Sequence, residues 1–140
     1  VLVSDGREIN SLGEKFDAIL IDAPCTGLGA LRRRPEVRWR RTLQDLRALT
    51  QLQRELIDSA IEALNPGGVL GYATCSPHLA ETSIQIADIK RKHTELNQID
   101  VGPFLPEKME GANRDGAMSL WTHKHGTDAM YLALFQKVQG

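Results

Sequence analysis

The chain has 140 residues, of which 41% are hydrophobic and 25% charged, and its formal net charge is −1. This size and ordinary composition predict one globular domain or part of one. No apolar run approaches the ~20 residues that a membrane-spanning helix needs, which excludes insertion into a membrane. The 2 cysteines lie far apart and follow no signal peptide, so a disulfide framework is not expected and a reducing, cytoplasmic setting fits best.

The first part of the chain predicts two short strands joined by a loop. Val1–Ser4 is apolar enough for a strand, and the polar residues Glu8–Lys15 indicate a loop. Phe16–Ile21 is almost entirely apolar towards its end, which predicts a strand buried on both faces. Asp22-Ala23-Pro24 ends this strand because proline cannot continue a central ladder.

A long amphipathic helix is predicted to begin after Thr42. The side chains of Thr42 and Asp45 can form an approximate capping box at its start. Apolar residues then recur every three or four positions, at Leu46, Leu49, Leu52, Leu56, Ile57, Ala60, Ile61 and Leu64. The helix is expected to end at Asn65-Pro66-Gly67-Gly68, which are helix-stop and turn residues.

The rest of the chain predicts a strand, a helix, two more strands and a long loop. The strands are expected at Val69–Ala73, Leu96–Val101 and Met130–Val138, and the helix at Leu79 to His93. The loop is the glycine-rich stretch Gly102–Thr127. Strands alternating with helices favour an α/β fold with a largely parallel sheet, whose last strand could be antiparallel. The glycine-rich turn that opens a nucleotide-binding fold is absent from the chain.

Two cysteine-bearing loops are the most informative feature. D-A-P-C-T-G at Asp22–Gly27 and Y-A-T-C-S-P at Tyr72–Pro77 each follow a predicted buried strand. Each therefore places a thiol at the carboxyl end of a strand, where open α/β sheets build their sites. A lone cysteine in such a place is most often a small buried hydrophobe. Two of them with matching flanks favour covalent chemistry instead.

An arginine-rich segment lies between the two cysteine loops. Six of the ten residues from Arg32 to Arg41 are arginine, and Trp39 lies within the run. A charge run is usually a solvated face. The exclusive use of arginine favours contacts with the phosphates or bases of a nucleic acid. Trp39 could stack on a base or pack under the arginine loop, and packing is the favoured interpretation.

Other candidate groups carry weaker signals. His123 and His125 form an H-x-H pair without carboxylate or thiol partners, so no metal site is expected. Glu81 is a candidate cap of the second helix. A thiol hydrolase using Cys75 would need a histidine beside the thiol, and only His78 is near in sequence.

The residues D-A-P-C-T-G-L-G-A-L-R-R-R-P-E-V-R-W-R and L-N-P-G-G-V-L-G-Y-A-T-C-S-P-H-L-A-E-T resemble the Nop/Sun family of RNA cytosine-5 methyltransferases. The likeness is nearest to the bacterial branch that methylates small-subunit ribosomal RNA (Sun/Fmu), and it spans nearly the whole chain. The closing H-K-H-G-T-D-A-M-Y-L-A-L-F is similar to the family's terminal strand motif, with mild departures at Ala129 and Met130.

This resemblance implies roles for individual residues. Cys75 would be the nucleophile that adds to C6 of cytosine, and Cys25 would assist removal of the C5 proton and release of the product. Asp22 would hydrogen-bond the cytosine edge and Pro24 would keep its loop rigid; together with Asp5 they would also contact the cofactor, S-adenosylmethionine. The candidates for holding the RNA, expected to be ribosomal, are Arg32, Arg33, Arg34, Arg38, Arg40 and Arg41.

The resemblance also implies that residues 1–140 are the C-terminal half of a class I, Rossmann-like methyltransferase domain. The first two strands and the glycine-rich cofactor loop would precede Val1, so the chain alone is expected to bind the cofactor weakly and to be inactive. Phe16–Ile21 would then be an exposed sheet edge, which predicts self-association. The alternative is a non-catalytic RNA-binding fragment that keeps the arginine loop.

Overall fold

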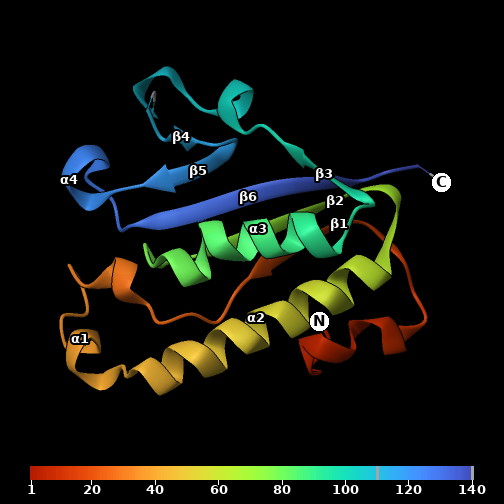
Figure 1. The fold of residues 1–140 in the computed structure, drawn as a ribbon, viewed down its shortest axis with the longest axis horizontal. Helices are drawn as coiled ribbons and strands as arrows, with labels where there is room; N and C mark the ends of the chain where they lie inside the picture. Colours follow the sequence, from red (N-terminus) through yellow and green to blue (C-terminus); the bar gives the residue numbers. More distant parts are fainter. Residues whose placement is uncertain (110, 140) are drawn as a thin grey trace.

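A computed structural model describes residues 1–109 and 111–139, and within them six strands form one mixed sheet (Figure 1). The strands are β1 (Phe16–Asp22), β2 (Leu64–Thr74), β3 (Leu96–Ile99), β4 (Asn113–Arg114), β5 (Ala117–Leu120) and β6 (Met130–Lys137). Their order is β1-β2-β6-β5-β4, and β3 pairs with the other end of β6. β1 and β2 are parallel, whereas β6 is antiparallel to β2, β3 and β5. The α/β class is confirmed, but the sheet is mixed rather than largely parallel.

The helices are α1 (Val37–Arg40), α2 (Leu43–Ala63), α3 (Ser83–Lys92) and α4 (Thr122–His125), with short 3₁₀ turns between them. The predicted capping box is present at α2, because the Thr42 side chain accepts from the Asp45 backbone while Asp45 accepts from that of Thr42. Asn65-Pro66-Gly67-Gly68 forms an irregular start of β2 rather than a separate turn. None of the helices among the described residues is long and apolar enough to cross a membrane.

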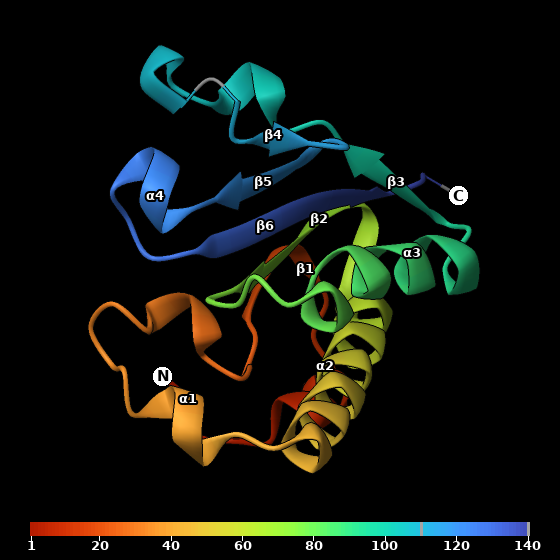
Figure 2. The same ribbon diagram turned by 60° about the vertical axis from the view of Figure 1, so that its left-hand side comes forward.

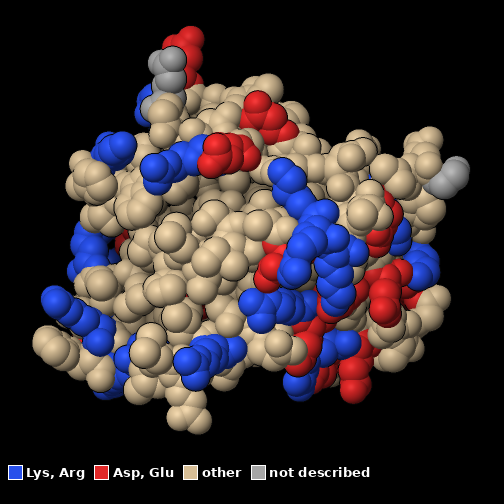
Figure 3. Space-filling model, in the orientation of Figure 1, with Lys and Arg blue, Asp and Glu red and all other residues tan. Residues whose placement is uncertain are grey.

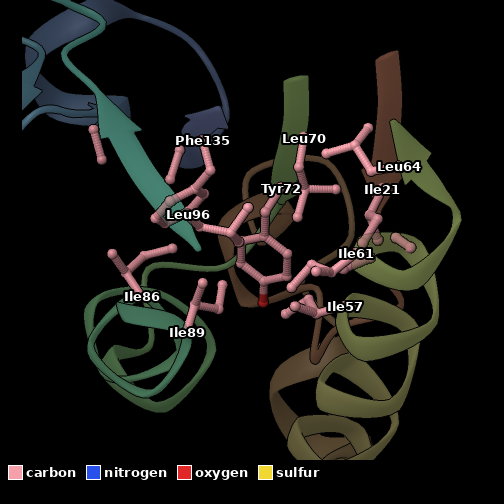
Figure 4. Close-up of a cluster of buried hydrophobic side chains, with 14 of the residues drawn as sticks. Ile21, Ile57, Ile61, Leu64, Leu70, Tyr72, Ile86, Ile89, Leu96 and Phe135 are labelled. Atoms are coloured by element: carbon pink, nitrogen blue, oxygen red, sulfur yellow. The ribbon is translucent and has the colours of Figure 1, made fainter. Parts of the chain in front are cut away.

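The core lies between one face of the sheet and the helices α2 and α3, with Tyr72 at its centre (Figure 4). The pairing of Ile21 with Tyr72, and of Tyr72 with Ala133, places all three side chains on this face. The helices contribute fully buried isoleucines, Ile57 and Ile61 from α2 and Ile86 and Ile89 from α3. Each such side chain contributes roughly 1.5–3 kcal/mol by leaving water, so this layer anchors the strand ends that carry the cysteine loops.

The opposite face of the sheet is open near β1. Figure 2 shows α2 and α3 on the same side of the sheet. Leu20 points the other way, pairs with Gly71 and is 70% exposed. The prediction that β1 is buried on both faces is therefore wrong, whereas its expected place at a sheet edge is confirmed.

The N-terminal residues differ from the prediction. Val1–Ser4 forms no strand, because it pairs with none of the described strands to complete a ladder. The predicted loop contains a 3₁₀ helix at Gly6–Leu12, which packs on α2. Asn10 fixes it there by donating to the Glu62 carboxylate at 2.7 Å.

The stretch Gly102–Thr127 is not a featureless loop. It holds the hairpin β4–β5, whose two turn residues Asp115 and Gly116 have φ of 53° and 80°. Both are left-handed, as the tight turns that suit the twist of a hairpin require, and Asp-Gly is a favoured pair there. Through β5 this hairpin pairs with the first half of β6, next to the end of the sheet where the cysteine loops lie.

We expect the chain to self-associate through β1. An edge strand offers unpaired backbone groups, and the exposed Leu20 adds apolar surface beside them. Size-exclusion chromatography with light scattering should give a mass above 15.5 kDa that rises with concentration. Leu20→Lys should shift the mass towards the monomer, while Leu43→Lys, an equally exposed leucine on α2, should not. A concentration-independent monomer would contradict this expectation.

Candidate active site

The two predicted cysteine loops meet at one edge of the sheet. β1 ends at Asp22 and β2 at Thr74, and because the two strands are parallel their carboxyl ends lie side by side. The backbone of Ala23 extends the pairing by donating to the Ala73 carbonyl at 2.9 Å. The sulfur atoms of Cys25 and Cys75 are then 3.4 Å apart, close enough for an S–H to donate to the other sulfur.

The two thiols have opposite acidities. The hydrogen bond from Cys25 lowers the pKa of Cys75 to about 6, against burial and the nearby negative charges of Asp22 and Glu81. The same bond, with burial, raises the pKa of Cys25 well above its ordinary value. These shifts predict that the pair holds a single proton at neutral pH, with the thiolate on Cys75.

A buried carboxylate joins the two loops. Glu81 is fully buried, and its carboxylate accepts from the backbone of Thr26 at 2.8 Å and from the Thr26 hydroxyl at 2.6 Å. It also accepts from the Ser76 hydroxyl at 2.6 Å and from the Gln53 amide of α2 at 3.2 Å. Thr26 and Ser76 directly follow the two cysteines, so one side chain fixes both loops relative to each other and to α2.

Gln53 and Tyr72 extend this network into the core. The Gln53 amide also donates to the Pro24 carbonyl at 2.9 Å, and its oxygen accepts from the Tyr72 hydroxyl at 3.1 Å. The Tyr72 hydroxyl lies 2.9 Å from the Glu81 carbonyl as well. The first cysteine loop is thus held at Pro24 and at Thr26, on both sides of Cys25.

Gly29 brings a third segment to the thiols. Its backbone N–H donates to the Cys75 carbonyl, and its own carbonyl accepts from Ala129, both at 2.9 Å. A Cβ atom at this position would lie 2.1 Å from the Ala129 carbonyl oxygen, so only glycine fits. The loop before β6 is thereby attached to both cysteine loops.

The arginine-rich segment is exposed, but its members differ. Arg33 donates to the Asp128 carboxylate, and Arg32 lies 3.7 Å from the other oxygen of that group. These contacts hold the pKa of Asp128 below its usual range, the bond from Arg33 being the main cause. Arg41 donates to the Thr26 carbonyl at 3.2 Å. Arg34, Arg38 and Arg40 are exposed; Arg34 has a distant contact with Glu36, and Arg38 lies over the Trp39 ring.

The interpretation of Trp39 as a packed side chain is wrong. The residue is 83% exposed, because the short helix α1 projects away from the core. Its nearest charged partner is Arg38, whose guanidinium lies 5.3 Å from the ring centroid. A base could therefore stack on this indole.

The structure places the predicted cofactor residues in two different settings. Asp22 and Pro24 flank the thiol pair, and Asp22 is exposed at the sheet edge. Asp5 instead caps the 3₁₀ helix at Gly6–Leu12 and forms an ion pair with Arg7 at 2.5 Å. Arg7 in turn contacts Glu55 of α2 at 3.3 Å, so this cluster fastens the N-terminal segment to the helix.

Sequence reasoning missed the residues that hold the site together. Glu81 was expected to cap the second helix, yet its side chain binds the cysteine loops. The sequence signal for Glu81 was indirect. This carboxylate comes shortly after a strand-end loop and is followed by the apolar positions of a helix. His78 accepts from the Ala80 backbone at 3.1 Å through its ring, and it makes no hydrogen bond to Cys75 among the described residues. A hydrolase dyad is therefore not formed.

Comparisons with known proteins give a consistent assignment. A family model described as 16S rRNA methyltransferase RsmB/F matches residues 1–136. A Mycobacterium tuberculosis protein named as a methyltransferase, Rv1407, is 51% identical over 134 residues, which are 96% of this chain and 29% of that protein. The ribosomal RNA small subunit methyltransferase B of Vibrio cholerae is 40% identical over 94 residues, 67% of this chain and 22% of that enzyme.

A solved structure supports the fold. NSun6 from Pyrococcus horikoshii, solved with SFG, matches 99% of this chain and 34% of its own with a TM-score of 0.81 and 33% identity. The chain therefore spans less than two fifths of the length of each of these three proteins.

The acidity of the thiol pair can be tested by alkylation. Because the pKa of Cys75 is lowered to about 6, its rate of reaction with iodoacetamide should rise through that pH, while Cys25 stays unreactive at neutral pH. Mass spectrometry of the separated peptides gives both rates. Cys25→Ala should move the midpoint of Cys75 upwards, and Cys25→Ser, which keeps a donor, should move it less. Equal rates for both thiols at every pH would contradict the assignment.

The role of Glu81 can be tested by denaturation. Glu81→Gln removes a charged acceptor from buried donors, which should lower the free energy of unfolding by about 1–3 kcal/mol. It should also disturb the alkylation midpoint of Cys75, because the loops lose their common anchor. Glu14→Gln, at an exposed position before β1, serves as the control and should change stability by less than about 0.5 kcal/mol. Urea titrations measure both effects, and equal stabilities of the two variants would argue against this role.

Proposed function

This chain belongs to the 16S rRNA methyltransferase RsmB/F family, and we propose that it carries the reacting thiols of an enzyme that methylates C5 of cytosine in RNA. The observation that carries the proposal is the pair of sulfurs 3.4 Å apart, with the acidity of one raised at the expense of the other. The names of the relatives favour small-subunit ribosomal RNA as the substrate.

Cys75 is the nucleophile in this proposal. Cytosine C5 is too weakly nucleophilic to take a methyl group directly. When the Cys75 thiolate bonds to C6, the electron pair of the C5–C6 double bond becomes available at C5. Asp22, exposed beside Cys75, is placed to hydrogen-bond the edge of the base and to stabilise this adduct.

Cys25 acts in the second half of the reaction. Once Cys75 is bonded to carbon, it is no longer a thiolate that accepts a strong hydrogen bond from Cys25. The main cause of the raised pKa of Cys25 then disappears. Cys25 can then lose its proton to water and take the proton of C5. The electron pair released from that C–H bond reforms the C5–C6 double bond, and Cys75 leaves as a thiolate.

The residues near the thiols fit a cofactor in part. The family depends on S-adenosylmethionine, which when bound would supply the methyl group that C5 receives. The Asp22 carboxylate makes no hydrogen bond to another described residue, so it can accept from a ligand, and the buried network holds Pro24 rigid beside it. Asp5 would first have to give up its bonds to Arg7. We therefore assign the nearer cofactor contacts to Asp22 and Pro24.

The arginine segment would bind the RNA backbone. Arg34, Arg38 and Arg40 are free to contact phosphates, and Trp39 offers an exposed stacking surface. Arg32, Arg33 and Arg41 attach the segment to Asp128 and Thr26. They would position the RNA relative to the thiols as well as contact it. The target base must leave its stack to reach Cys75.

Trapping of the covalent adduct tests this proposal. RNA that carries 5-fluorocytosine should remain attached after methylation, because a C5 fluorine cannot be removed as a proton is. With ordinary cytosine, Cys25→Ala should accumulate the adduct, and Cys75→Ala should form none with either RNA. Denaturing gels and mass spectrometry of the linked peptide give the readout.

The assay is run on this chain alone and on this chain grafted into the mycobacterial relative in place of the matched 134 residues. The grafted form supplies whatever further parts the relative contains. Adduct in the grafted form only would mean that this chain carries the thiols but needs those parts for cofactor binding. RNA binding without adduct in both forms would favour the alternative, a non-catalytic RNA-binding module.

A further inference from the structure

We propose that a groove between α3 and the β4–β5 hairpin binds the nucleotide next to the target cytosine, with its base stacked on Trp121. This inference rests on the proposed function, because it places RNA at the thiols. It adds a second contact surface, separate from the arginine segment.

The groove is continuous with the catalytic loop. It has a volume of about 400 Å³, in the range of a small-molecule site, and Ser76 and Pro77 form part of its wall. These residues directly follow Cys75. The far wall comes from the hairpin and from Trp121 and Tyr131, which lie at either end of the loop between β5 and β6. A nucleotide in the groove would therefore be adjacent to a base held at the thiols.

The chemistry of the walls suits a nucleotide. The Arg114 guanidinium lies 5.9 Å from the centroid of the Trp121 ring, and Lys90 of α3 stands on the opposite wall. Stacking on an aromatic ring combined with basic side chains is how proteins hold single-stranded nucleic acid. In Figure 3 uncharged surface dominates the left-hand and central part of this face, and a mixed cluster of basic and acidic side chains lies to the right of its centre. The two basic groups of the groove face one carboxylate, that of Asp115.

The second large groove is a weaker candidate. It lies between the C-terminal part of α3 and α2 and is lined by Arg54, Asp58, Asp88 and Lys92. Its charges already neutralise one another, since Arg54 lies 3.4 Å from Asp88 and Lys92 2.5 Å from Asp58. Its lining holds no tryptophan, tyrosine or phenylalanine and no residue of the cysteine loops. Of these two grooves, the one at Trp121 combines basic side chains with an indole and adjoins a cysteine loop.

The 2 tryptophans of the chain allow a direct test. In Trp39→Phe, Trp121 is the sole indole, and single-stranded RNA decamers that contain one cytosine should quench its fluorescence saturably. In Trp121→Phe, Trp39 reports binding at the arginine segment. Trp121→Ala should weaken RNA binding about 5- to 100-fold. Trp121→Phe should restore most of it, which separates stacking from a general loss of the hairpin.

Arg114→Ala should weaken binding and reduce its salt dependence, whereas Lys124→Ala, an exposed cation on α4, should change neither. The inference is overturned if RNA quenches Trp39 but leaves Trp121 unchanged, or if Trp121→Ala binds RNA as tightly as the parent. Its failure is distinguishable from that of the proposed function. If an adduct forms at Cys75 but RNA leaves the fluorescence of Trp121 unchanged, only the groove is contradicted. If RNA quenches Trp121 but no adduct forms, only the catalytic role is contradicted.

Discussion

The arrangement of the site depends on one buried carboxylate. Glu81 has no access to water, and burying a charge is costly unless its lone pairs are occupied. Four donors from two loops and one helix occupy them here. Because two of these donors belong to Thr26 and one to Ser76, the cost of burying Glu81 is offset only when both cysteine loops adopt their observed positions. The distance between the two sulfurs therefore follows from the hydrogen bonds that the buried Glu81 carboxylate requires, although Glu81 takes no part in the proposed reaction.

The residues before β6 link the thiols to the arginine segment. Gly29 lies between the Cys75 carbonyl and Ala129, and the neighbouring Asp128 holds Arg33 and Arg32. These contacts connect the arginine segment to the loop of Cys75 through Asp128, Ala129 and Gly29. Under the proposed function, RNA bound at the arginine segment would therefore be coupled to the position of Cys75. The open face of the sheet around Leu20 does not contribute to these contacts, because it lies on the other side of the sheet from α2 and α3.

Much of this architecture follows from the sequence, and the failures have physical causes. The strand β1, the capped helix α2, the strand β6 and the meeting of the two cysteine loops were all predictable from periodicity, caps and the geometry of parallel strand ends. Val1–Ser4 has the composition of a strand, but a strand also needs a neighbour, which periodicity cannot show. The β4–β5 hairpin had a local signal in Asp115-Gly116, which was lost in a stretch rich in glycine. The exposure of Trp39 depends on tertiary packing alone, and the burial of Glu81 had only the indirect signal of a carboxylate shortly after a strand-end loop.

In the proposed reaction, a pair of unequal thiols solves a proton problem that a single cysteine cannot. The first proposed step needs a thiolate, and the later one needs a base that was not consumed in the first. In this pair the proton that Cys25 keeps is what stabilises the negative charge of Cys75. When Cys75 forms its bond to carbon, its negative charge is lost, and with it the main cause that keeps Cys25 protonated. Under the proposed function the base therefore becomes available only after the nucleophile has reacted, and the order of the two proposed steps follows from the electrostatics of two sulfurs 3.4 Å apart.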